Sequence, residues 1–88
     1  MANSVIPQRI VKFGFSGNVD SDGDLITNCP INSYVPASCC TSTSRTGWIY
    51  EFHTNTNKSE NYWYVNIRDT SGTIGTGEFN GSFYALKN

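Results

Sequence analysis

The chain has 88 residues and a formal net charge of −1, and only 15% of its residues are charged, against 38% hydrophobic and 14% aromatic. This length predicts one small domain, spanning 1–88, that buries about 60–65% of its unfolded surface. The near-neutral charge argues against nucleic-acid binding, and no apolar run approaches the roughly 20 residues that a membrane helix needs.

The N-terminus, MANSVIPQRIVKF, lacks a basic stretch followed by a long apolar run, so we expect no secretory signal. Asn, Ser, Thr and Gly dominate the polar residues. Such a hydroxyl- and amide-rich composition is typical of extracellular, cell-surface and virion proteins. It does not assign a location.

The first predicted strand is Arg9–Phe15 (RIVKFGF), in which apolar residues alternate. Val11, Phe13 and Phe15 share one face, and Ile10 and Lys12 share the other. The following stretch, 17–27, contains Asp-Gly at 22–23. This pair predicts a turn that leads into a short return strand.

The acidic run Asp20-Ser21-Asp22-Gly23-Asp24 partly matches a calcium loop. Its aspartates stand at positions 1, 3 and 5 of the EF-hand pattern. However, Leu25 stands where that pattern requires Gly, and Ile31 stands where it requires Glu. We therefore expect a turn with solvated aspartates and no metal site, with weak calcium binding as the alternative.

Residues 27–47 (TNCPINSYVPASCCTSTSRTG) show no firm period, so we predict an irregular connection, with 31–35 as a possible short edge strand. The three cysteines at 29, 39 and 40 are an odd number. We interpret them as reduced, small, buried hydrophobic residues, and a bridge from Cys29 to Cys39 or Cys40 is the alternative. The only histidine, His53, does not complete a zinc pattern with them.

Residues 48–69 predict a hairpin in which 55–60 joins two strands. A register centred on Asn57-Lys58 pairs Phe52 with Trp63, and Tyr50 with Val65. It also pairs Trp48 with Ile67. These six side chains are the predicted core face of the hairpin.

After the hairpin, Thr and Gly at 70–77 predict a turn and then a thin or bulged strand approached closely by another backbone. We expect 79–86 to form one continuous strand that keeps Phe79, Phe83 and Ala85 on one face; a hairpin turn at Asn80-Gly81 is the alternative. No stretch shows helical periodicity. The predicted fold is all-β: a small antiparallel β-sandwich or barrel of about five to six strands.

The opposite face of the hairpin carries aromatic and polar side chains where a merely solvated face would more often carry Lys, Glu and Thr. Flat rings edged by hydrogen-bonding groups suit a polar ligand or a protein partner. Cover by a second sheet or by another subunit is the alternative. The predicted contact residues are Glu51, His53, Tyr62, Tyr64, Asn66 and Arg68.

Three functions fit this face. A non-enzymatic binding and assembly module, such as a small virion or cell-surface component that forms homo-oligomers or binds another protein, comes first. A carbohydrate-binding (lectin-like) protein that stacks a tyrosine on a sugar comes second. A nuclease-like enzyme using Glu51, His53 and Arg68 comes third, because a single histidine leaves the second proton transfer without a group. No cofactor is expected.

Overall fold

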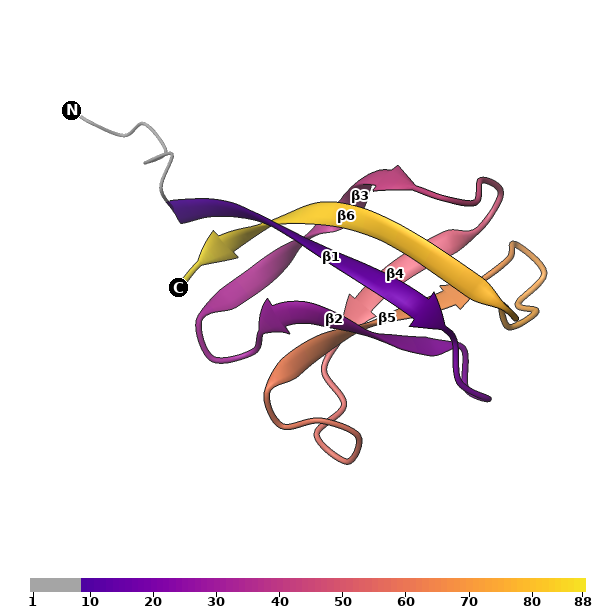
Figure 1. Ribbon diagram of the computed structural model, residues 1–88, viewed down its shortest axis with the longest axis horizontal. Helices are drawn as coiled ribbons and strands as arrows, with labels where there is room; N and C mark the ends of the chain where they lie inside the picture. Colours follow the sequence, from indigo (N-terminus) through magenta and orange to yellow (C-terminus); the bar gives the residue numbers. More distant parts are fainter. Residues whose placement is uncertain (1–8) are drawn as a thin grey trace.

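The computed structural model describes residues 9–88 and consists of six antiparallel β-strands (Figure 1). Residues 1–8, where we expected no secretory signal, lie outside the described residues. None of the described residues belongs to a helix long and apolar enough to cross a membrane. The strands are β1 (Ile10–Asn18), β2 (Asp24–Pro30), β3 (Tyr34–Thr43), β4 (Ile49–His53), β5 (Tyr62–Arg68) and β6 (Glu78–Lys87).

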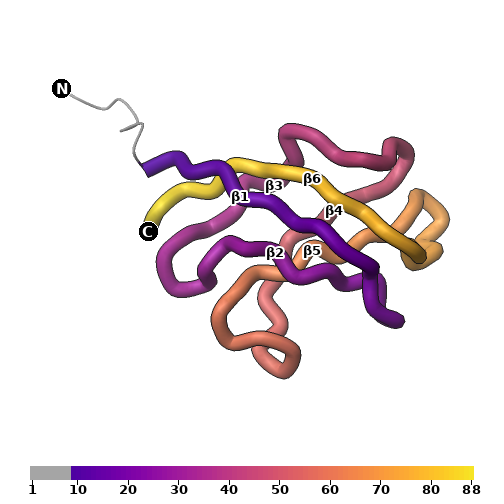
Figure 2. The backbone as a smooth tube through the Cα atoms, in the orientation of Figure 1, coloured from indigo at the N-terminus to yellow at the C-terminus, as the bar shows by residue number. Residues whose placement is uncertain are grey.

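The strands follow the order β3-β6-β1-β2-β5-β4 in one nearly closed, barrel-like sheet (Figure 2). The predicted all-β class is confirmed. The sheet consists of two three-stranded halves, β3-β6-β1 and β2-β5-β4, whose inner faces pack on each other. Their side chains form one core, in which the largest fully buried members are Phe79, Phe83, Ile67, Val65 and Cys29.

The predicted alternation places the core correctly. Phe15 is buried and Phe13 packs against the core, whereas Ile10 on the other side of β1 is exposed. The predicted turn is also confirmed: the chain reverses at Asp22-Gly23, where Gly23 adopts a φ of +81°. Few residues other than glycine adopt this conformation without strain.

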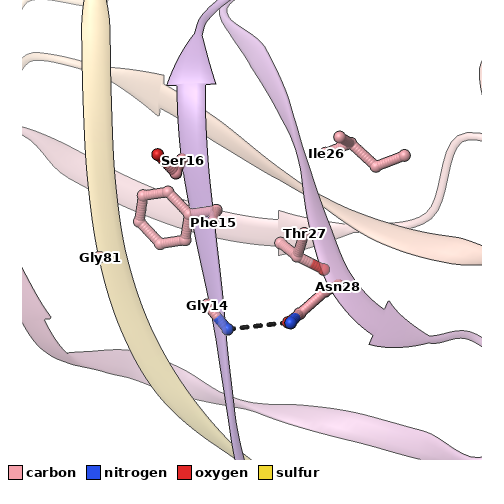
Figure 3. Close-up of a pocket in the computed structure, with 7 residues that line it drawn as sticks. All are labelled: Gly14, Phe15, Ser16, Ile26, Thr27, Asn28 and Gly81. Atoms are coloured by element: carbon pink, nitrogen blue, oxygen red, sulfur yellow. Dashed lines mark hydrogen bonds between the residues drawn. The ribbon is translucent and has the colours of Figure 1, made fainter.

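The two halves of the sheet meet where β1 pairs with β2. One residue pair, Phe15 opposite Thr27, defines the register of these two strands. The Gly14 backbone N–H donates to Asn28 Oδ1 at 2.9 Å, so a side chain takes the place of a ladder bond (Figure 3). A surface hollow of about 440 Å³ opens at this junction. Its lining, drawn in Figure 3, is Gly14, Phe15, Ser16, Ile26, Thr27, Asn28 and Gly81.

The prediction of an irregular connection over 27–47 is wrong, because this stretch holds the end of β2 and the whole of β3. Ile31–Ser33 forms the turn between them. The register of β3 with β6 shifts between Pro36 and Cys40 and again between Cys40 and Ser42. These irregularities break the period-two pattern, and an edge strand tolerates them.

The three cysteines of this region are free thiols. Cys29 is buried, Cys40 is partly buried, and Cys39 is exposed. Burial raises the pKa of both Cys29 and Cys40 to about 11. The interpretation as small buried hydrophobes is confirmed for Cys29. It is wrong for Cys39, which is exposed on the edge strand β3.

The predicted β4–β5 register is wrong by two residues. Tyr50 lies opposite Ile67, and Phe52 lies opposite Val65. The connection is a wider loop, in which the backbone N–H groups of Lys58 and Ser59 both donate to the Asn55 carbonyl. An even shift leaves every side chain on its predicted face.

The residues of the predicted core face are confirmed despite the shift in register. All six of its expected side chains are buried or pack against the buried cluster: Trp48, Tyr50, Phe52, Trp63, Val65 and Ile67.

The last part of the chain confirms the continuous strand β6, with Phe79, Phe83 and Ala85 fully buried on one face. Residues 70–77 form a turn and a single bridge, between Ile74 and Arg68, where a thin strand was expected. The predicted close approach does occur, because the Gly75 N–H donates to the Ile67 carbonyl at 2.9 Å.

Candidate functional site

The outer side of the half-sheet β2-β5-β4 brings the predicted contact residues together, and we call it the polar face. Its centre is three cross-strand rows fixed by the register of the three strands and by the Ile74 bridge. The rows are Ile26-Tyr64-His53, Asp24-Asn66-Glu51 and Ile74-Arg68-Ile49.

Asp24 is the buried centre of this face, with 4% of its side chain exposed. His53 Nε2 and Asn66 Nδ2 each donate to Asp24 Oδ1 at 2.9 Å, and Lys58 Nζ donates to Oδ2 at 2.8 Å. Desolvation raises the pKa of Asp24, but the hydrogen bonds from Lys58, Asn66 and His53 outweigh it and leave that pKa below its ordinary value. The carboxylate therefore stays ionised and holds His53 in its Nε2–H form.

The predicted acidic turn joins the same network through Lys58. Its ammonium donates to Asp20 at 2.6 Å, to Asp22 at 3.0 Å and to Asp24 at 2.8 Å. Desolvation raises the pKa of Asp20, but hydrogen bonds from Lys58 and from the turn backbone outweigh it and leave that pKa below its ordinary value. The hydrogen bonds to Asp20 and Asp24 raise the pKa of Lys58.

The three carboxylates could in principle hold a metal ion, because one oxygen from each lies within 4.8 Å of the others. The Lys58 ammonium sits against all three. A divalent cation would have to displace a group of the chain itself. The three carboxylates that could bind a metal ion are therefore already paired with the positive charge of Lys58.

Glu51 and Arg68 form a second, more exposed pair on this face, with Arg68 Nη2 donating to Glu51 Oε1 at 2.6 Å. An ion pair of this exposure contributes little to stability. The three residues of the nuclease-like hypothesis thus all lie on one face. Each is bound to another side chain: Arg68 to Glu51, and His53 to Asp24.

The two predicted tyrosines lie in different environments. Tyr64 is only 9% exposed, and the Lys58 ammonium lies 5.9 Å from the centre of its ring. Tyr62 lies opposite Pro30 at the start of β5 and is exposed. The ring of Tyr64 is therefore largely buried within the chain, and the ring of Tyr62 is open to solvent.

A hollow of about 380 Å³ lies in the middle of the polar face and contains four of the six predicted contact residues. Its lining is Asp22, Asp24, Glu51, His53, Asn66 and Arg68. Sequence reasoning missed Asp22, Asp24 and Lys58, since it interpreted the acidic run as a solvated turn. The position of Asp24 could have indicated its role, because Asp24 begins the return strand and its side chain lies on the face opposite that of Leu25.

Three isoleucines that the sequence analysis did not single out as contacts surround this hollow. Ile26, Ile49 and Ile74 are each between 42% and 46% exposed. They stand at the ends of the outer two rows of the face. The face thus combines a charged centre with an apolar rim.

Comparison of the chain with known protein families, with characterised proteins and with solved structures finds no match in any of the three. The geometry and charge of the polar face are therefore the features that indicate a function.

Proposed function

We propose that this chain is a non-enzymatic binding and assembly module that associates with copies of itself through the polar face. The observation that supports the proposal is the exposed isoleucine rim around a fixed, charged centre. Apolar contacts combined with hydrogen-bonding groups in fixed geometry are typical of protein interfaces. The hydroxyl- and amide-rich, charge-poor composition suits a virion or cell-surface structural component.

The charge of the face favours a partner surface with basic groups. Four carboxylates, Asp20, Asp22, Asp24 and Glu51, surround two cations, Lys58 and Arg68. The face is therefore net negative. Such a field repels phosphates and steers basic surfaces toward it, which supports the expectation that nucleic acid is not the partner.

A glycan is the second candidate ligand. The hollow offers carboxylate and amide groups that can bind hydroxyls, and its volume falls in the range of ligand sites. Of the two tyrosines that could stack on a sugar, Tyr64 is largely buried, and Tyr62 is exposed but does not line the hollow, so we rank glycan binding below assembly. The catalytic hypothesis ranks third, because Arg68 is already paired with a carboxylate and offers no free clamp for a phosphate.

Light scattering over a hundredfold dilution series tests the proposal. We expect the wild type to exceed its 9.7 kDa chain mass at high concentration and to dissociate on dilution, while Ile49→Lys remains monomeric. Asn32→Lys is the matched control, since it adds the same charge at the exposed turn between β2 and β3, and we expect it to behave as the wild type. A wild type that is monomeric throughout, or an Ile49→Lys variant that assembles normally, contradicts the proposal.

A further inference from the structure

A second exposed surface lies on the outer side of the other half-sheet, β3-β6-β1. Four large apolar side chains are between 39% and 53% exposed there. The register places Ile10, Leu86 and Val35 in one row across three strands, and Tyr84 opposite Lys12 in the neighbouring part of the sheet. We call this surface, made of Ile10, Lys12, Val35, Tyr84 and Leu86, the apolar face.

The contiguity of these side chains follows from strand geometry. Directly opposed residues in a ladder have Cβ atoms about 4.5–5.5 Å apart. Ile10, Leu86 and Val35 therefore form a continuous apolar strip. A contiguous apolar patch on a small domain commonly marks a site of interaction.

The apolar face and the polar face lie on the outer sides of different half-sheets. Phe83 and Ala85 alternate with the exposed residues of β6, and Val65 and Ile67 alternate with those of β5. All four inner residues are fully buried in the same core. The outer sides of the two half-sheets therefore lie on either side of this shared core, and they approach each other at the opening between β3 and β4, where Val35 and Ile49 line one hollow. Figure 2 follows the path of the backbone through the two half-sheets.

The charges of the two faces are complementary. Lys12 lies on the apolar face, opposite Tyr84. Lys87, at the end of β6, pairs with Tyr34 and alternates with Leu86, so its place in the strand is on the inner side of the sheet. Neither β1 nor β3 contains an acidic residue, and Glu78 of β6 lies at the far end of that strand. The apolar face thus carries one cation, Lys12, with no carboxylate beside it in these strands, whereas the polar face is acidic and has an apolar rim.

We infer that the apolar face is the counter-surface for the polar face of a second copy, so that the chain assembles head to tail. Joining two polar faces would bring two net-negative surfaces together, whereas joining a polar face to an apolar face pairs opposite charges. A contact between two different surfaces is heterologous and produces rings or filaments. This inference rests on the proposed assembly function and adds its second surface and its symmetry.

Mixing two variants, each with one face blocked, tests the inference. Ile49→Lys blocks the polar face, and Leu86→Glu blocks the apolar face by placing an acid at a strongly exposed position. We expect each variant alone to remain monomeric. An equimolar mixture should contain a species of twice the 9.7 kDa chain mass, because one intact face of each kind remains.

The other outcomes separate the inference from the proposed function. Wild-type assembly by Leu86→Glu alone overturns head-to-tail pairing and leaves assembly through the polar face standing. Wild-type assembly by Ile49→Lys alone overturns both. A mixture that stays monomeric, when each variant alone is monomeric, also overturns head-to-tail pairing. The pair Ile26→Lys and Tyr84→Glu repeats the experiment at other exposed positions if either first variant fails to fold.

Discussion

Replacing Asp24 with Asn tests whether the buried carboxylate organises the polar face. Asn retains the shape of Asp but removes the charge. It also replaces one acceptor oxygen with an NH2 group, which then faces the donor of Lys58 or the donors of His53 and Asn66. Three hydrogen bonds to a charged acceptor are weakened or lost. A hydrogen bond to a charged group contributes about 1.5–3 kcal/mol, and breaking a buried pair costs about 3–5 kcal/mol.

The expected loss lies below the sum of those bonds, because Lys58 keeps its contacts with Asp20 and Asp22. We therefore expect Asp24→Asn to lower the free energy of unfolding by about 2–4 kcal/mol. Asp22→Asn is the matched control. The Asp22 side chain is 70% exposed and has one 3.0 Å contact with Lys58, so its loss should stay below about 1 kcal/mol.

Urea unfolding followed by tryptophan fluorescence at several pH values provides the measurement. A carboxylate whose folded pKa is depressed stabilises the fold above its unfolded pKa of about 3.9, and that contribution is lost as the pH falls through the folded value. The pKa of Asp24 is lowered in this way. The wild type should therefore lose stability below about pH 4 more steeply than Asp24→Asn. Equal losses in the two variants, or parallel acid profiles, would refute the reasoning.

Two further predictions concern the core and the cysteines. Gly81→Ala should cost about 1–3 kcal/mol by overpacking, because the added Cβ would lie 2.6 Å from Phe15 Cζ; unchanged urea stability would contradict this. In the native protein at pH 8, a thiol reagent should modify exposed Cys39 first and Cys40 more slowly, and should reach Cys29 only on unfolding, since burial gives the latter two a pKa of about 11. Simultaneous reaction of all three thiols would show that Cys29 is not held in the core.

The faces of the β4–β5 hairpin could be predicted because strand alternation survives an error in register. Glu51 and Asn66 were expected on one outer face, and they lie directly opposite each other on it. The network of buried and charged side chains at the centre of this face could not be predicted. It depends on Lys58, whose loop returns across Tyr64 to reach an acidic turn 34 or more residues earlier in the chain.

The strand β3 could not be recognised for a different reason. Period-two reasoning requires an uninterrupted ladder, and Pro36 and the register shifts around Cys40 interrupt it. What holds β3 in place is contact with distant segments. It pairs with β6, and the indole N–H of Trp63, on β5, donates to the Tyr34 carbonyl at 2.9 Å.

The most direct test of assembly through the two faces is a pair of amide ¹H–¹⁵N NMR spectra of the wild type, recorded at dilute and at hundredfold higher concentration. Concentration-dependent changes are predicted at Ile26, Ile49 and Ile74 on one side of the molecule and at Tyr84 and Leu86 on the other. The turn at Ile31–Ser33 should remain unchanged. Identical spectra at both concentrations, or changes confined to residues outside both faces, would contradict the account.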